Sequence, residues 1–528
     1  MRPMTSALPG EFRRNPLLMF GFFVFVAVAA WKAAEYVISG SLISLTYAAM
    51  ILVAGAFVVA MLNNWRNGLY FFLFWLLFED FARKFLGNNM AIYFAKDFLV
   101  LIVYLSFFLA YRRKKVHTFR PPFLIPLLIF LWFGVMQVFN PASSSLMYGV
   151  LGLKLYYYYI PLLFIGYALV DTEETLRRFY FINIGLALII VSLGIAQAIL
   201  GHTFLNPVHP ADDIRELSQL YRMAPISGVL VYRPTSVFVS AGRFADYLLA
   251  IWLLAFGFSG YLLLRHRRGR NITFISLAVT FAAVALCASR GVFLWIISAA
   301  IVATAAFLWG APWRQREVMR VMRTLQRAIL GVVLGFGLLM VTYPEALLSR
   351  LAFYSETLSP DSPSSELMHR VRDYPLRNLL FAFDYPRWPY GYGIGTASLG
   401  VQYVSRIMQV PAMGIGVESG FGTLIVEMGI GGLALWLIMS ASVLFAAWKV
   451  VYKLKGSPWF PLGFMIFWYA FLLLVPLTFY GIQPYQDFVL NAFLWLQLGI
   501  LFRLPSIALS AQFAANAPSA QPSRRWIR

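Results

Sequence analysis

Long apolar stretches recur along almost the whole chain, and short polar or basic segments separate them. A helix needs about 20 mostly apolar residues to cross the hydrocarbon core of a bilayer, because each residue adds about 1.5 Å to its length. The pattern predicts spans at 16–34, 42–62, 68–86, 91–110, 122–139, 148–169, 178–200, 240–263, 272–289, 291–310, 328–343, 419–447, 458–480 and 487–502. The predicted fold class is therefore all-α, a polytopic membrane helix bundle of about fourteen transmembrane helices in one domain, residues 1–507.

The two ends of the chain need separate interpretations. Arg13 and Arg14 precede an apolar stretch that ends in small residues, as in a signal peptide. The many spans that follow favour an uncleaved first helix. Residues 508–528 are rich in Ala, Ser, Gln and Pro, a composition that predicts a disordered cytoplasmic tail.

The connections between spans predict the orientation. Alternate connections carry most of the basic residues, for example Arg112 to Lys115 and Arg265 to Arg270. Because basic loops stay in the cytoplasm, these connections and both termini are predicted to face it. The opposite connections are short except for two long ones, 201–239 and 344–418, which we expect outside the membrane in the periplasm.

The longer of these outer loops is predicted to be helical in part. A connection of this length in a compact protein is usually functional or forms a small folded insert. A Ser- and Pro-rich cluster, 359–365, separates an amphipathic stretch at 344–358 from a second one at 366–383. We expect both stretches to lie on the outer membrane face or to close over a cavity.

The composition agrees with a membrane protein, because 60% of the 528 residues are hydrophobic and only 12% are charged. The net charge of +21 would favour nucleic acid as a partner of a soluble chain, but here it is explained by the basic cytoplasmic loops. No nucleic-acid partner is therefore expected. Cys287 is the single cysteine, so an intrachain disulfide or a cysteine-based metal site is excluded.

Charged residues within spans are candidates for function, because a charge in the hydrocarbon costs at least about 2.5 kcal/mol. All of them fall in the predicted outer half of the membrane. They are Glu79, Asp80, Arg83, Lys84, Lys96, Asp97, Lys154, Arg243, Asp246, Arg290, Glu418 and Glu427. The inner halves of these spans are nearly free of charge, so the pattern does not favour a polar path through the membrane.

Several of these residues also have a simple structural interpretation. Glu79 and Lys84 could reach the membrane interface without any further role. Arg243 and Asp246 are three positions apart, so they could form a local ion pair on one helix face. Glu427 could form hydrogen bonds between helices, since the glycines that follow it suit close helix packing.

Searches for familiar catalytic motifs leave few candidates. The chain has no Asp-x-Asp, no Walker A motif, no His-Glu-x-x-His and no Gly-x-Ser-x-Gly. His202 and His209, with Asp212 and Asp213, could form a metal site, but the favoured interpretation is that they are satisfied or solvated loop residues. The glycines of 391–395 lack dinucleotide spacing and predict a tight turn in close contact with another segment.

The outer arginines predict an anionic lipid as substrate. An arginine offers a fixed fork of donors that matches phosphate oxygens, so a cluster at the membrane surface suits a polyprenyl diphosphate. The order of four motifs, at 232–238, 288–291, 389–395 and 418–432, resembles the O-antigen ligase and Wzy-type polymerase superfamily over about residues 145–450. The resemblance implies a GT-C glycosyltransferase that is inverting and metal-independent, with a large outer loop and no cofactor.

The resemblance also implies roles for particular residues. Arg233 and Arg290 match arginines that are thought to bind the diphosphate of the lipid donor. Arg372 matches a loop arginine that is less uniform among family members. Arg370 could match the same arginine equally well. Ligases carry a His where this chain has Glu418, and a carboxylate there could still accept a proton from a sugar hydroxyl. Alternatively, Glu418 caps the N-terminus of its helix.

The function that follows is polymerisation of lipid-linked oligosaccharide repeat units, for exopolysaccharide or O-antigen, at the bacterial inner membrane. Catalysis is assigned to Glu418, Arg233 and Arg290; the candidate substrate-binding residues are Arg372, Arg370, Arg243, Lys154, Asp97 and Glu427. We expect lipid-linked donor and acceptor glycans, the bilayer, a flippase and a chain-length regulator as partners. An O-antigen ligase is the alternative enzyme. A flippase or transporter is the alternative of another class, but no repeated halves are found.

Overall fold

The computed structural model describes residues 58–86, 90–113, 116–117, 119–206, 220–265, 268–313, 340–358, 373–410 and 416–516, with residue 55 and a few short pieces between 326 and 338. The described residues are mostly helical. The chain divides into two compact units, Met1–His117 and Thr118–Arg528.

The first unit contains the antiparallel helices α3 (Trp65–Leu86) and α4 (Met90–Arg112). Their apolar sides pack together, and the hydroxyl of Ser106 donates to the carbonyls of Met61 and Leu62, both at 3.0 Å. The spans predicted at 68–86 and 91–110 are thus confirmed as helices. The span at 16–34 and most of that at 42–62 lie outside the described residues.

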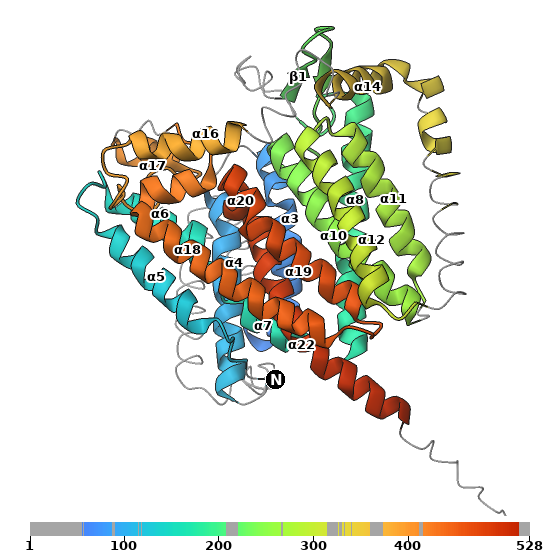
Figure 1. The fold of residues 1–528 in the computed structure, drawn as a ribbon, viewed down its shortest axis with the longest axis horizontal. Coiled ribbons are helices and arrows are strands. Elements are labelled where there is room, and N and C mark those ends of the chain that lie inside the picture. Colours follow the sequence, from blue (N-terminus) through green and yellow to red (C-terminus); the bar gives the residue numbers. More distant parts are fainter. Residues whose placement is uncertain are drawn as a thin grey trace, which may run out of the picture. The chain divides into compact units, whose positions relative to one another are not determined.

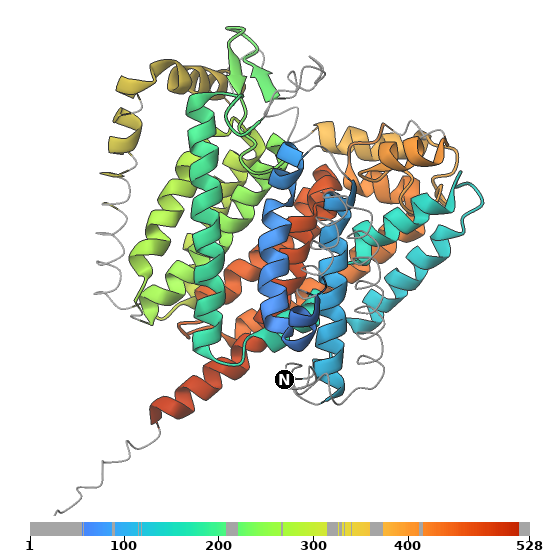
Figure 2. The ribbon, with the colours of Figure 1, turned by 180° about the vertical axis from the view of Figure 1, so that it is seen from behind.

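The second unit contains the remaining long helices (Figures 1 and 2). They are α5 (Leu124–Val138), α6 (Leu146–Tyr157), α7 (Leu162–Leu169), α8 (Glu173–Leu200), α10 (Ala241–Leu264), α11 (Arg270–Leu286), α12 (Arg290–Gly310), α18 (Gly420–Lys453), α19 (Phe460–Leu474) and α22 (Phe488–Asn516). In the described part of the chain, eight helices are long and apolar enough to cross a membrane. The prediction of a helical membrane protein is confirmed at this level.

Some predicted spans are interrupted, and one continues further than expected. The predicted span at 458–480 divides into α19 and the short helix α20 (Pro476–Tyr480), because Pro476 has no amide hydrogen for the helical ladder. At the other end of the chain, α22 extends through residue 516. The boundary predicted for a disordered tail, residue 508, therefore lies within a helix.

Helix α10 lies at the centre of the second unit. Nearly all of its residues are buried, and it packs against α8, α11, α12 and α19. After Asp246 its sequence is apolar on every face, which is typical of a helix surrounded by other helices. The two arginine-bearing segments of interest adjoin this central element, since one leads into α10 and the other connects α11 to α12.

The two kinds of connection lie at opposite ends of the second unit. One end carries the two-stranded hairpin of β1 (Tyr221–Met223) and β2 (Leu230–Tyr232), with α14 (Pro344–Leu358), α16 (Tyr374–Phe381) and α17 (Val401–Met408), as Figures 1 and 2 show. The C-terminal end of α10 and the N-terminal end of α11 lie at the other end. The hairpin, antiparallel with Tyr221 opposite Tyr232, is a small β element that the all-α prediction missed.

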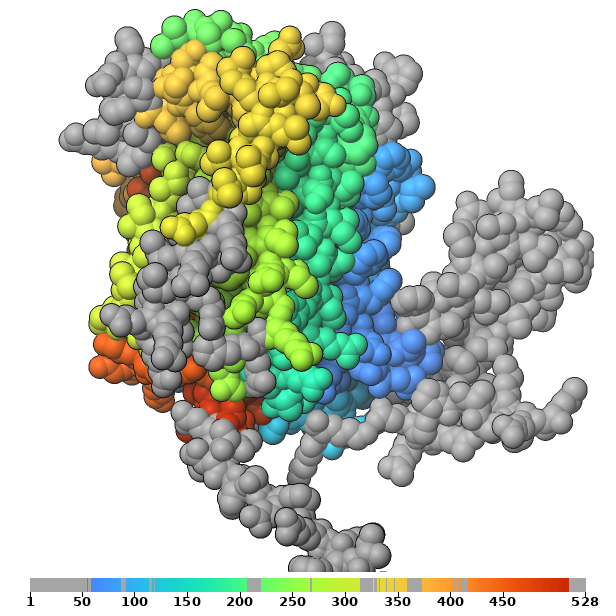
Figure 3. Space-filling view, turned by 90° about the vertical axis from the view of Figure 1, so that its right-hand side faces the viewer, coloured from blue at the N-terminus to red at the C-terminus, as the bar shows by residue number. Residues whose placement is uncertain are grey.

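The amphipathic stretch predicted at 344–358 is confirmed as α14. This helix lies across the ends of α8 and α11, where Figure 3 shows it in yellow above their green surfaces. The second predicted stretch is described only from residue 373 onward, as α16 and the short 3₁₀-helix η4 (Ala382–Asp384). Both elements therefore belong to the end of the unit that carries the candidate site.

Candidate functional site

Arg233 directly follows strand β2, and its backbone is held on both sides. Its amide donates to the carbonyl of Leu220 at 2.8 Å, which extends the pairing of the two strands. The side-chain carbonyl of Gln197 accepts from the amides of Thr235 at 2.8 Å and Ser236 at 2.7 Å. The hairpin and α8 therefore fix the backbone from which the Arg233 side chain extends.

Both arginines that were assigned to the donor diphosphate lie near a residue with a left-handed backbone. Ser236, three positions after Arg233, has a φ of 51°, and Ala288, two positions before Arg290, has a φ of 50°. This conformation costs roughly 1–2 kcal/mol for a residue with a Cβ atom. Such strain is found disproportionately at functional sites, where the surrounding structure enforces it. The hydroxyl of Ser236 donates to the carbonyl of Ile190 at 2.6 Å, which helps to hold this backbone.

Arg290 is the first residue of α12 and lies beneath α14. Its guanidinium carbon is 5.3 Å from the centre of the Phe353 ring, a cation–π contact. The neighbouring Tyr354 stacks on Phe293 of α12, with the ring centres 5.0 Å apart. Helix α14 therefore packs directly on the corner that carries Arg290.

One apolar cluster joins the segments that carry the two arginines. Its buried members are Ala224 and Val231 of the hairpin, Ala288 of the α11–α12 corner, and Phe353 of α14. Arg233 comes two residues after one member of this cluster, and Arg290 comes two residues after another. The tertiary structure thus brings together two motifs that are distant in the sequence.

The guanidinium of Arg233 has few compensating contacts. Its Nε atom is buried without a hydrogen-bond acceptor, and the side chain has no ion pair with any described residue. Burial lowers the pKa of Arg233 from its ordinary value, and the positive charge of Arg222 lowers it further. An anion against this guanidinium would supply both the missing acceptor and a countercharge.

Arg350 of α14 is a third arginine in this region, and the sequence reasoning did not single it out. It is almost fully buried. Its guanidinium donates to the carbonyls of Leu286 at 2.7 Å, Tyr232 at 3.1 Å and Ala198 at 3.3 Å. These carbonyls lie at the ends of α11, β2 and α8, so Arg350 ties α14 to three elements. The available signal was its place on the buried face of the amphipathic stretch, three residues after Leu347.

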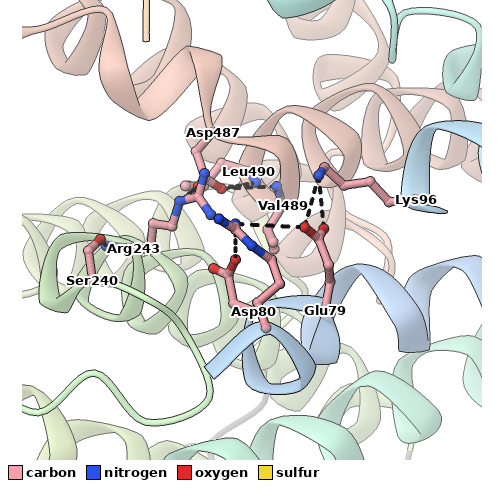
Figure 4. A network of polar contacts seen from close by, with 9 residues as sticks. Glu79, Asp80, Lys96, Ser240, Arg243, Asp487, Val489 and Leu490 are labelled. Atoms are coloured by element: carbon pink, nitrogen blue, oxygen red, sulfur yellow. Dashed lines mark hydrogen bonds and ion pairs between the residues drawn. The ribbon is translucent and has the colours of Figure 1, made fainter. Parts of the chain in front are cut away.

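The local ion pair expected between Arg243 and Asp246 does not form. Instead, Nε of Arg243 lies 3.2 Å from Oδ2 of Asp487, a pair that Figure 4 shows. The other oxygen of Asp487 accepts from the amides of Val489 and Leu490 at 2.9 Å and 3.1 Å and so caps α22. Asp487 was missed as a site residue, although an acidic residue directly before an apolar run is typical of a helix cap.

Lys154, another predicted substrate-binding residue, lies beside this ion pair. Its ammonium is 5.2 Å from the centre of the Phe488 ring, and the guanidinium carbon of Arg243 is 5.4 Å from the same ring. One aromatic ring therefore contacts a cation from α6 and a cation from α10. Lys154, Arg243 and Asp487 form a second charged group at this end of the unit.

Glu427 has the structural role that was left open for it. Its side chain is fully buried in α18. One carboxylate oxygen accepts from the amide of Ala397 at 2.9 Å and the hydroxyl of Ser398 at 2.7 Å, and the other accepts from the hydroxyl of Tyr156 at 3.0 Å. With three donors already bound, this carboxylate joins α6, α18 and the loop after the glycines. We assign it to the framework and not to substrate binding.

The glycine turn at 391–395 contacts this part of α18 as predicted. Gly391, Gly393 and Gly395 all have positive φ values. A Cβ atom on Gly391 would lie 2.4 Å from the carbonyl oxygen of Glu427, and one on Gly429 would lie 2.4 Å from that of Pro389. Gly429 itself has a φ of 72° and a ψ of −178°, which interrupts α18. Side chains at either position would separate the two backbones.

Glu418 lies directly before α18 and is exposed. The helix cap is Ser419, whose hydroxyl accepts from the amide of Gly422 at 3.4 Å and donates to the carbonyl of Phe479 at 2.9 Å. The alternative that Glu418 provides the side-chain cap is therefore wrong. Its carboxylate stays a candidate base at the same end of the second unit.

The first unit has its own ion network, and Figure 4 labels its residues Glu79, Asp80 and Lys96. The ammonium of Lys96 lies 2.9 Å from Oε2 of Glu79, and the guanidinium of Arg83 lies 3.2 Å from Oδ1 of Asp80. Both cations also lie over the ring of Tyr93, at 3.5 Å and 5.0 Å. Glu79 is buried within this network, so the expectation that it merely reaches the interface is wrong.

Only some of the other candidate residues lie in the described part of the chain. Asp97 of α4 and Lys84 of α3 are half-buried in the first unit. The Nδ1 atom of His202 lies 3.1 Å from the hydroxyl oxygen of Tyr221. The predicted residues that lie outside the described part of the chain are Arg370, Arg372, His209, Asp212 and Asp213.

Comparison with known proteins finds no family model that matches the chain and no curated protein that is similar to it. The resemblance to the ligase and polymerase superfamily therefore rests on the motifs and stays a prediction. Interpretation of the site depends on the chemistry of the residues that the fold brings together.

Proposed function

We propose that this protein is a membrane glycosyltransferase that polymerises oligosaccharide repeat units carried on a polyprenyl diphosphate. The observation that carries the proposal is Arg233, a half-buried side chain whose Nε atom is buried without an acceptor. An unpaired buried charge is costly unless a ligand compensates it. A diphosphate at the membrane surface is the anion that best fits an arginine in the segment that leads into a membrane-spanning helix.

The surroundings of Arg233 support the same ligand. Arg222 and Arg290 are further cations near this site, one from the hairpin and one from the α11–α12 corner. Clustered arginines can neutralise the charge that develops on a departing diphosphate, which is the electrophilic part of the reaction. Arg370 or Arg372 would assist from the loop, as the family resemblance implies.

The reaction exchanges one bond for another. The oxygen of the acceptor hydroxyl forms a bond to the anomeric carbon of the donor sugar, and the bond from that carbon to the diphosphate breaks. The electron pair leaves with the diphosphate, whose charge Arg233 and Arg290 neutralise. Glu418, exposed at the start of α18, takes the proton of the hydroxyl.

The proposal includes a topology of fourteen spans with both termini in the cytoplasm of a bacterial inner membrane. The arrangement of the second unit supports it, since the end of α10 and the start of α11 lie opposite the end with the hairpin and α14. A background variant, Cys287→Ser, would remove the single native thiol. Ser227→Cys should then react with an impermeant reagent from outside and Arg268→Cys only from the cytoplasm. The reverse pattern would contradict the topology and the site.

The decisive experiment uses the full-length protein in nanodiscs with the purified lipid-linked repeat unit. We expect a ladder of longer glycans, visible by gel electrophoresis or mass spectrometry. Arg233→Lys keeps the charge but loses the fork, and its rate should fall about 100-fold, as when one transition-state donor is removed. Arg268→Lys, an exposed arginine at the opposite end, is the matched control. No ladder from the wild type, or an unchanged ladder from Arg233→Lys, would contradict the proposal.

A further inference from the structure

Asp246 is a carboxylate in the second turn of α10 for which the proposed reaction has no use. Its side chain is half-buried, while its neighbours Ala245 and Tyr247 are buried. The residue that was expected to pair with it, Arg243, binds Asp487 instead. Asp246 has no hydrogen bond or ion pair with any described residue, although a charge on a membrane-spanning helix normally has a partner.

The position of Asp246 relates it to Arg233. Arg233 lies within electrostatic range of Asp246 without forming an ion pair, and the carboxylate of Asp487 is a further charge near Asp246. Phe238 lies 5.3 Å from Tyr247 between ring centres, so the segment after Arg233 folds back along α10 beside Asp246. Gln197 holds the same segment through two amides. The backbone therefore keeps the two charges near each other but apart.

Three other carboxylates at this end of the unit are less suited to a ligand. Glu427 already accepts three hydrogen bonds, and Asp487 binds Arg243 and caps α22. Glu418 is exposed at the start of α18. Asp246 combines partial burial, the absence of a partner among the described residues and the proximity of an unpaired guanidinium.

A ligand that satisfies both residues must carry an anion next to a group that donates hydrogen bonds. A bare phosphate satisfies only the arginine, and an uncharged sugar satisfies only the carboxylate. A sugar linked to a diphosphate carries both groups on adjacent atoms, since ring hydroxyls lie close to the anomeric oxygen. Carboxylates are strong acceptors for such hydroxyls.

We infer that Arg233 holds the diphosphate of the lipid-linked sugar and that Asp246 binds the hydroxyls of this sugar. The two residues together therefore recognise a glycosyl diphosphate and not the lipid diphosphate alone. The inference rests on the proposed function and extends it. Asp246 determines specificity by distinguishing the glycosylated lipid from the lipid that remains after transfer. After each transfer the lipid diphosphate no longer carries the sugar whose hydroxyls Asp246 binds. The bare lipid diphosphate is then bound less tightly and is released.

The test compares the binding of two lipids to the full-length protein in nanodiscs. One is polyprenyl diphosphate, and the other is the same lipid bearing the oligosaccharide repeat unit of the cells that make the protein. We expect the wild type to bind the glycosylated lipid at least tenfold more tightly. Asp246→Asn should bind both lipids within threefold of each other, with the affinity for the bare lipid unchanged. Arg233→Lys should weaken the binding of both.

Two further variants keep the test decisive. Asp384→Asn, on the exposed surface of η4, is the matched control and should keep the tenfold preference. Asp246→Glu keeps the charge but moves it by one methylene, so it should reduce the preference even if Asp246→Asn fails to fold. A wild type without a preference, or an Asp246 variant that keeps the preference, would overturn this inference alone. Failure of both lipids to bind the wild type would contradict the proposed function as well.

Discussion

Two charged residues in the second unit, the buried Glu427 and the half-buried Arg233, have opposite surroundings. Each carboxylate oxygen of Glu427 has at least one donor, and the side chain joins α6, α18 and a loop. The guanidinium of Arg233 has an Nε atom without an acceptor and a pKa that burial lowers. The first arrangement stabilises the fold, whereas the second leaves a charge for a ligand to compensate.

This difference in hydrogen bonding distinguishes residues that hold the fold together from residues of the candidate site more clearly than residue type does. Both residues belong to motifs of the same family resemblance, and both were candidates for function. The backbone next to Arg233 and Arg290 includes the strained residues Ser236 and Ala288, while Gly429 relieves the equivalent strain near Glu427 because it has no side chain. Strain is retained where the position of a side chain matters for more than packing.

The contrast predicts the largest loss of stability for Glu427→Ala. This change leaves the amide of Ala397 and the hydroxyls of Ser398 and Tyr156 without an acceptor, which should lower the free energy of unfolding by about 4 kcal/mol. Thermal unfolding in nanodiscs, followed by tryptophan fluorescence, measures the loss. Glu345→Ala, on the exposed side of α14, is the control. Unchanged stability in Glu427→Ala would mean that this carboxylate is free for substrate.

A smaller loss is expected for Gly429→Ala, because the backbone there is accessible almost only to glycine and the new Cβ would overlap the carbonyl of Pro389. The free energy of unfolding should fall by about 2 kcal/mol. Gly431→Ala is a closely matched control, since its Cβ would meet Phe133 at an ordinary 3.5 Å. Equal stability of the two variants would show that the glycine turn is not held against α18.

Unlike these two variants, Arg233→Met should not lower the free energy of unfolding. Removal of a half-buried charge without an ion pair should leave the free energy of unfolding unchanged or raise it by about 1 kcal/mol, while glycan synthesis is lost. The same unfolding measurement, combined with the glycan ladder, tests this separation of stability from activity. A marked destabilisation would place Arg233 with Glu427 in the framework.

The smallest effect concerns Glu356, which links α14 to the hairpin. Its carboxylate accepts from the amides of Ile226 at 2.8 Å and Ser227 at 3.1 Å. The pKa of Glu356 is lowered, chiefly by the hydroxyl of Ser227 and then by these amides. A lowered folded-state pKa gives stabilisation that is present above the ordinary pKa of glutamate, about 4.3, and lost as the pH falls through the folded value.

Hydrogen exchange of the hairpin amides, corrected for intrinsic rates, can follow this effect. Protection at residues 226 and 227 should be present at pH 7 and decrease below about pH 4. Glu356→Gln should lack this pH dependence, whereas Glu345→Gln should keep it. Protection that is equal at both pH values in the wild type would contradict the proposed link.

Much of the helical organisation could be predicted because it depends on local properties. The helices α8, α10, α12 and α14 lie within a few residues of the predicted stretches. The hairpin was not predicted, since strands of three residues leave almost no pattern in a sequence. The division of the chain at residue 117 likewise has no strong signal in composition.

The candidate site was predictable only as a set of residue types. The motifs indicated Arg233 and Arg290, because arginines near the ends of apolar spans are costly and therefore informative. They could not indicate that Arg350 binds the carbonyls of three elements, since those carbonyls come from three separate parts of the sequence. Nor could they indicate that Asp487 would take Arg243 from Asp246.

Hydrophobic length and charge act locally, so the amino-acid pattern alone is enough to predict a helical membrane protein with charged residues near the ends of its spans. Which of these charges are paired depends on the three-dimensional packing. Glu427 and Arg243 found partners on other helices, while Arg233 and Asp246 were held apart by Gln197 and the packing of Phe238 on α10. The physical reason is that a hydrogen bond requires an approach within about 3 Å, which depends on elements that are remote in the sequence.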